Sequence, residues 1–215
     1  MGGHLHKLSR LSIWAAVIIV MLYLFPPFHI RRIAGGTTQG DGKLAAADIG
    51  RIAADFWNDH LAAPGVPPTD ARALLEALNQ DPTAAGQRYG RRPGIGGPMF
   101  YLVAGEGRVI STDRAGVWLD LGVGGPVRTV LQTGPIFGSA LRDATGLLHP
   151  QDFSSFEFNE LGARLNRLSE TRGEAPLRSA VQAGSRVQFL AAGRLNDTMG
   201  DAPVLKLAPI RVRVQ

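Results

Sequence analysis

The stretch MFYLVAGEGRVISTDRAGVWLDLGVGGPVRTVLQ, residues 99–132, decides the fold class. It contains four short runs rich in β-branched and aromatic residues, and glycine-containing segments separate them, which is typical of strands joined by hairpins. The predicted strands are Met99–Ala104, Arg108–Thr112, Val117–Leu121 and Val127–Gln132. The segments Gly105-Glu106-Gly107 and Asp113-Arg114-Ala115-Gly116 are predicted to be turns between them.

Upstream of these strands, residues 44–90 are predicted to be helical. Ile49, Phe56 and His60 belong to one face of a first amphipathic helix, which Pro64-Gly65 ends. A second helix follows Thr69 or Asp70 as its N-cap. A third begins at Asp81-Pro82, a capping residue followed by proline at the first helical position, and stops at Tyr89-Gly90.

Downstream, one helix interrupts the strands before the last two follow. Ser154 and Glu157 form a capping-box pattern at the start of a helix over 154–168. The last strands are predicted at Arg186–Ala192 and Val204–Val214. The order of elements predicts an α+β fold, in which residues 97–215 form a small antiparallel barrel of the OB type with an inserted helix.

The N-terminal segment, residues 1–33, is predicted to be an uncleaved membrane anchor. Residues 11–30 are almost entirely apolar. As a helix, a run of this length spans the hydrocarbon core of a bilayer. A cleaved signal peptide and a buried core helix are the alternatives. Phe25-Pro26-Pro27-Phe28 lacks the small residues of a cleavage site, and a run that is apolar all round at the N-terminus is untypical of a core helix. Residues 34–43 are a linker by composition, so residues 44–215 form one domain, which we expect in the periplasm beside the inner membrane.

The net charge of +5 does not indicate a nucleic-acid-binding protein. Residues 1–33 hold four basic and no acidic residues, and the rest of the chain holds 19 basic and 18 acidic residues. A phosphate-binding surface needs clustered positive charge. We therefore expect no nucleic-acid partner.

No combination of residues in the sequence indicates catalysis, a metal site or a cofactor. The chain has no cysteine, and its five histidines do not have the spacing of metal ligands. Ser139 lies outside any nucleophile elbow, and the glycine-rich Gly90–Gly97 lacks a phosphate-binding pattern. We expect a protein that is not an enzyme.

The run QTGPIFGSALRDATGL, residues 132–147, is the best candidate for a binding segment. Gly134-Pro135 ends a strand, and Arg142-Asp143 places two opposite charges among apolar neighbours. In a structural interpretation, the pair anchors the loop to the barrel through charge-assisted hydrogen bonds. In a functional one, Arg142 presents its planar fork to a carboxylate or to a hydroxyl-rich ligand.

Several motifs together resemble the predicted periplasmic lipoproteins grouped as domain of unknown function 2291. They are the helix with Asp55-Phe56-Trp57, the segment DPTAAGQRYG at 81–90, the segment GPIFGSALRDA at 134–144, and Asp152-Phe153 leading to Leu165-Asn166. The resemblance runs from about Ile30 to the C-terminus. It adds Tyr89 and Asn166 to Gly134, Pro135, Arg142 and Asp143 as candidate ligand-binding or partner-binding residues. Phe28 stands where members carry the lipid-bearing cysteine, so the apolar helix would have to provide the anchor.

The resemblance implies a secreted accessory protein, often encoded beside sugar ABC-transporter genes, with no established activity. Our first hypothesis is therefore a non-enzymatic binding protein whose partners are transporter components or a small sugar. Phe100, Tyr101, Trp118 and Phe137 are aromatic residues that could stack on a sugar ring, although most are expected to pack in the core. The alternative is a hydrolase acting on a periplasmic carbohydrate, with a site built on Arg142, Asp143 and Asp113.

Overall fold

The computed structural model describes residues 46–63, 65–94, 96–196 and 202–215. The predicted anchor and the linker lie outside these residues. Within the described part of the chain, no helix has both the length and the apolar character needed to cross a bilayer. The prediction of a membrane-spanning segment at residues 11–30 therefore stays a prediction.

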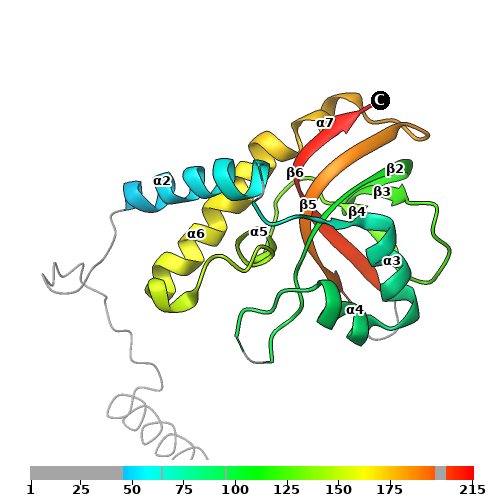
Figure 1. The fold of residues 1–215 in the computed structure, drawn as a ribbon. Coiled ribbons are helices and arrows are strands. Elements are labelled where there is room, and N and C mark those ends of the chain that lie inside the picture. Colours follow the sequence, from blue (N-terminus) through cyan, green and yellow to red (C-terminus); the bar gives the residue numbers. More distant parts are fainter. Residues whose placement is uncertain (1–45, 64, 95, 197–201) are drawn as a thin grey trace, which may run out of the picture. The chain divides into compact units, whose positions relative to one another are not determined.

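Three helical segments precede the five long strands, as the sequence predicts (Figure 1). Helix α2 (Ala46–Phe56) continues into a π-helical turn, η1 (Trp57–Ala62). Helix α3 (Ala71–Gln80) is capped by Asp70, whose carboxylate accepts from the amide of Ala73. Helix α4 (Pro82–Tyr89) is capped by Asp81, and a two-residue strand, β1 (Thr69–Asp70), precedes α3.

Five longer strands form a closed barrel. They are β2 (Tyr101–Asp113), β3 (Gly116–Asp120), β4 (Arg128–Leu131), β5 (Arg186–Asn196) and β6 (Val204–Val214). Their order around the barrel is β2-β3-β4-β6-β5, and the pairing of β5 with β2 closes it. This strand order is the OB topology.

The prediction of an antiparallel barrel is wrong at one pairing. Strand β4 pairs with β6 in parallel, from Arg128 opposite Val204 to Leu131 opposite Leu207, so the barrel is mixed. The helical region between β4 and β5 is the reason. Because the chain does not return beside β4 when it enters β5, β4 meets the second strand of the following hairpin and not the first. Sequential hairpin signals do not predict such a parallel pair.

The predicted turn at 105–107 is also wrong, because these residues lie inside the long strand β2. Both glycines are needed for close packing and not for a turn. A Cβ on Gly105 would lie 2.5 Å from the Cβ of Ala71 on α3, and one on Gly107 would lie 2.8 Å from a methyl carbon of Leu121. The two predicted strands therefore form one strand that passes close to its neighbours.

The segment between β4 and β5 is mostly helical. It contains α5 (Ala140–Asp143), a short 3₁₀ turn, η2 (Pro150–Asp152), α6 (Ser155–Leu168), a π-helical turn, η3 (Ser169–Gly173), and α7 (Ala175–Ala180). The predicted capping box of α6 is present, with Ser154 and Glu157 bonded reciprocally. Glu160 and Arg164, four residues apart on α6, form an ion pair at 2.7 Å.

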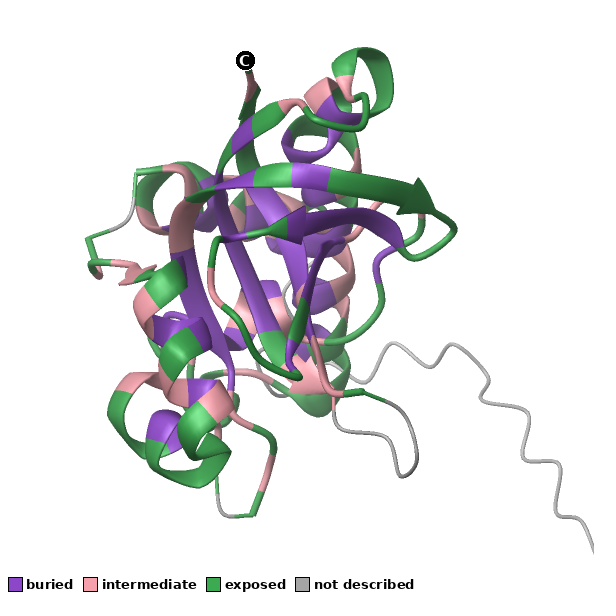
Figure 2. Ribbon diagram, turned by 90° about the vertical axis from the view of Figure 1, so that its right-hand side faces the viewer, coloured by how far each residue is buried: buried purple, intermediate pink, exposed green. Residues whose placement is uncertain are grey.

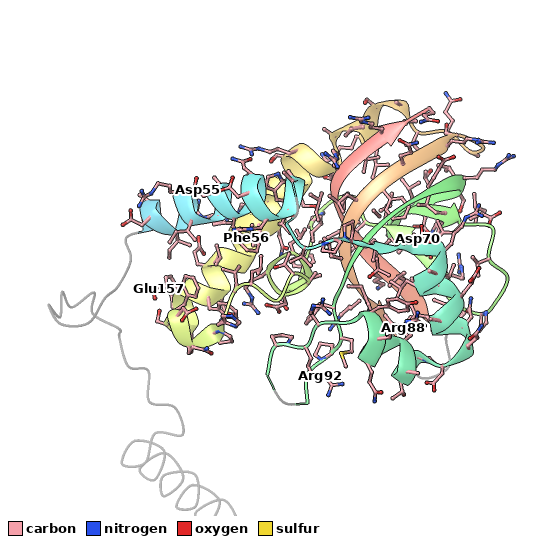
Figure 3. The ribbon with its side chains drawn as sticks, viewed as in Figure 1. Asp55, Phe56, Asp70, Arg88, Arg92 and Glu157 are labelled. Atoms are coloured by element: carbon pink, nitrogen blue, oxygen red, sulfur yellow. The ribbon has the colours of Figure 1, made fainter. Side chains whose placement is uncertain are left out.

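Two apolar clusters lie on opposite faces of the shared strands, so strands at the centre of the domain are buried on both sides (Figure 2). One cluster fills the barrel and is covered by Leu74 and Leu78 of α3. The other lies between the outer face of the barrel and α2, α5 and α6. Figure 3 shows Phe56 on the side of α2 that faces α6, with Asp55 on the outer side. The outer cluster thus fixes the helical region against the barrel.

Candidate functional site

The segment that follows β4 is held along α6 and its continuation by three side chains. The amide of Gly134 donates to Glu174 Oε2 at 2.7 Å, and the amide of Ile136 donates to Glu170 Oε1 at 2.7 Å. Asn166 Nδ2 donates to the carbonyl of Gly138 at 2.9 Å. We call residues 134–139 the clamped loop.

The spacing of these bonds explains why they form together. The bonded loop residues are two apart, and the helical side chains that bind them are four apart in the opposite direction. Asn166 lies in α6, Glu170 lies in the π-helical turn η3, and Glu174 directly follows η3. These three side chains are therefore about one helical turn apart. Each turn of the helical region binds every second residue of the loop.

The clamped loop holds a phenylalanine in solvent. Ile136 is buried in the outer cluster, whereas Phe137 is 84% exposed. Gly138 has a φ of +101°, a conformation that favours glycine, and it follows Phe137 directly. The loop therefore presents the Phe137 ring to solvent on a backbone that is hydrogen-bonded on either side of it.

Arg142 and Asp143 form the charge-assisted hydrogen bonds that the structural interpretation predicts, but these bonds join the two residues to each other and to α6, whereas the interpretation expected the barrel. Arg142 Nε donates to Asp143 Oδ1 at 2.7 Å, and Nη2 donates to Oδ2 at 3.0 Å. Nη1 donates to the carbonyl of Phe158 at 3.0 Å, and the guanidinium lies 3.6 Å from the centre of the Phe158 ring. The side chains are 11% and 1% exposed. The fork of Arg142 is therefore engaged within the protein and joins α5 to α6.

A cavity of about 440 Å³ lies beside this pair. Its lining comes from the clamped loop and α5, from the loop before β2, and from the ends of β4, β5 and β6. The lining residues are Pro93, Pro98, Phe100, Gln132, Phe137, Gly138, Ser139, Ala140, Arg142, Asp143, Arg194, Asn196 and Lys206. The volume lies within the range of small-molecule sites.

The structure brings only some of the predicted binding residues to this cavity. Arg142 and Asp143 line it, and Asn166 supports its wall by holding Gly138. Gly134 and Pro135 lie earlier in the clamped loop and do not line it. Tyr89 lies at the end of α4, where it packs against the barrel cluster beneath the guanidinium of Arg88.

Of the four aromatic residues considered for stacking, Phe100 and Phe137 line the cavity, and only Phe137 exposes its ring to solvent. Phe100, Tyr101 and Trp118 are buried, and burial raises the pKa of the Tyr101 hydroxyl above its ordinary value of 10.0. No sequence pattern points to Arg194 and Lys206, which also line the cavity. They are 12 residues apart in the chain, and only the register of β5 and β6 places them together.

The residues of the hydrolase hypothesis do not form one site. Asp113 lies at the turn between β2 and β3 and does not line the cavity that holds Asp143. Its carboxylate accepts from the indole of Trp118 and from the amide of Ala115, both at 2.8 Å. These bonds, that of Trp118 foremost, hold its pKa below the ordinary value of 3.8. In the described part of the chain, no three His, Cys, Asp or Glu residues gather as metal ligands.

These features define an α+β protein with a five-stranded mixed OB barrel, one face of which is covered by helices, and with a cavity beside a clamped loop. The chain belongs to the family of predicted periplasmic lipoproteins DUF2291, whose model matches residues 18–213. Its sequence contains no cysteine that could carry a lipid.

A crystal structure of an OB-fold protein from Thermotoga maritima is similar to this chain, with a TM-score of 0.64 and 21% identity. The similarity covers 81% of this chain and 100% of that one, and it establishes the fold. No curated protein matches the chain.

Proposed function

We propose that this protein is a non-enzymatic binding module, held at the periplasmic face of the inner membrane by residues 11–30, which takes a small sugar in the cavity beside the clamped loop. Membership of a predicted periplasmic lipoprotein family supports the compartment. The missing cysteine and the apolar N-terminal run support an anchor made of protein.

The exposed side chain of Phe137 at the rim of the cavity is the observation that carries the sugar proposal. Sugar sites commonly combine an aromatic face, which packs on the C–H groups of the ring, with polar side chains that bind hydroxyls. Gln132, Ser139 and Asn196 supply such polar groups around the same cavity. The resemblance to proteins encoded beside sugar transporters agrees with this use.

The test is a thermal-shift and calorimetric screen of the full-length protein in detergent against pentoses, hexoses, polyols and sugar acids. We expect at least one sugar to bind, and we expect Phe137→Ala to weaken that binding about tenfold or more. Phe156→Ala is the matched control, because Phe156 is 72% exposed at the start of α6 and does not line the cavity. The absence of binding by every sugar, or equal losses in the two variants, would refute the proposal.

The accessory role is tested separately by crosslinking in intact cells. A photoreactive residue in place of Phe137 should form a crosslink to a component of a sugar transporter. The yield of this crosslink should change when a sugar is bound. The same residue placed at Phe156 gives the background. Equal products at both positions would argue against a transporter partner at this site.

A further inference from the structure

Two basic side chains lie directly opposite each other at the mouth of the cavity. Arg194 on β5 and Lys206 on β6 are paired in register. Their neighbours Leu195 and Leu205 pack with the barrel cluster. Since successive side chains of a strand point to opposite faces, Arg194 and Lys206 both point outward, into the cavity that they line.

No carboxylate among the described residues balances this pair. Asp143 is the acidic residue that lines the cavity, and both of its oxygens accept hydrogen bonds from Arg142. Other arginines of the barrel and the helices have acidic partners, as Arg186 has Glu106 and Arg164 has Glu160. The ion pairs within the described residues include neither Arg194 nor Lys206.

Like charges directly opposite on neighbouring strands are destabilising. In the cavity lining, Asp143 balances the charge of Arg142, and Arg194 and Lys206 add two positive charges. The net charge of the lining is therefore positive. An anion between Arg194 and Lys206 would accept charge-assisted hydrogen bonds from both side chains and remove their repulsion. The cavity thus combines two basic side chains with the aromatic ring of Phe137.

We propose that the ligand is a small sugar with a negatively charged group, a carboxylate or a phosphate, which binds between Arg194 and Lys206. This inference rests on the proposed function, since it names the class of sugar that the cavity takes. Arg142 serves as a positioning residue that holds α5 beside the site and does not bind the anion with its engaged fork.

The experiment measures binding to the full-length protein by calorimetry with four probes: galacturonate, galactose 6-phosphate, galactose and citrate. We expect the two charged sugars to bind, galactose to bind much more weakly, and added salt to weaken the charged sugars. Whichever charged sugar binds more tightly identifies the anionic group. Arg194→Gln and Lys206→Gln should each lower the affinity for it about tenfold, the loss of one hydrogen bond to a charged group.

Arg213→Gln is the matched control, because Arg213 is an exposed cation on the same strand as Lys206 and lies outside this cavity. It should leave the affinity unchanged. Equal binding of galactose and galacturonate, unaffected by the two substitutions, would overturn the inference and leave the sugar proposal standing. Binding of citrate alone, lost in both variants, would keep the anion site and refute the sugar. Binding of none of the probes would refute the inference.

Discussion

A single carboxylate, Asp113, ties the turn between β2 and β3 to the indole of Trp118. Arg128 lies over the other side of this indole, 3.8 Å from its ring centre, so the ring has a cation on its face and an anion at its nitrogen. The hydrogen bonds of Asp113 favour its charged form and lower its pKa. A group with a lower pKa in the folded state stabilises that state above its unfolded pKa, and the contribution is lost as the pH falls through the folded pKa.

The hydrogen bond between Asp113 and Trp118 predicts that the titration of Asp113 can be followed at the indole proton of Trp118. The indole resonance of Trp118 should move as Asp113 takes up a proton, with a midpoint below pH 3.8. In Asp113→Asn the same resonance should stay flat, and the free energy of unfolding should fall less steeply with acid than in the wild type. Nuclear magnetic resonance over an acid titration checks both. A wild-type midpoint at or above the ordinary value would contradict the prediction.

Substitution of glycine by alanine should have opposite effects on stability at Gly105 and at Gly50. Gly105→Ala would place a Cβ 2.5 Å from Ala71, so α3 and β2 must separate. We expect a loss of about 1–3 kcal/mol in the free energy of unfolding. Gly50 lies in α2 with no atom near the position of an added Cβ, and Gly50→Ala should raise stability by up to about 1 kcal/mol. Urea denaturation of both variants measures the two changes in the free energy of unfolding. If both variants are less stable than the wild type, the helix propensity of alanine does not determine stability at position 50.

Among the elements, the continuation of α6 through η3 matters most for the site, because it holds the clamped loop. Glu174 is fully buried, accepts from the amide of Gly134 and pairs with Arg178. Glu174→Ala should leave that amide without its acceptor and cost about 1–3 kcal/mol. Hydrogen exchange should quicken first at Gly134 and Ile136, and urea denaturation should report the loss of stability.

The control for this prediction is Glu160→Ala, on the outer part of the same helix. Glu160 forms a partly exposed pair with Arg164 one turn away, and such pairs contribute about 0–1 kcal/mol. Exchange at Gly134 should not change in this variant. Similar exchange rates in the two variants would show that the loop is held by its own packing and not by Glu174.

The sequence predicts those parts of the elements whose causes are local. Asp81-Pro82 and the Ser154–Glu157 box specify helix starts because each capping side chain reaches amides two or three residues away. The prediction of a turn at Gly105 is wrong because the residue that requires a glycine there, Ala71, lies on another element. The ion pair of Arg142 with Asp143 is also local, since the two are adjacent, whereas the contact of Arg142 with Phe158 depends on the packing of α5 against α6. Arg194 and Lys206 could not be predicted, since their meeting depends on the register of two strands.

At the level of the domain, the barrel and the helical layer share strands and therefore share stability. Leu102 and Leu190 face the outer cluster, while their neighbours Val103 and Phe189 face the barrel interior. Loss of either cluster would expose apolar side chains on one face of these strands and so remove part of the burial that stabilises them. The two clusters should therefore unfold together, although separate elements build them.

Two matched substitutions test this cooperativity. Leu161 on α6 and Leu207 on β6 are both fully buried, one in the outer cluster and one in the barrel. Leu161→Ala and Leu207→Ala should each cost about 2–5 kcal/mol. The indole protons of Trp57, in the outer cluster, and Trp118, on β3, should then disappear at the same urea concentration within each variant. If Trp57 were lost earlier than Trp118 in Leu161→Ala, the helical layer would unfold on its own, and the clamped loop would open without loss of the barrel.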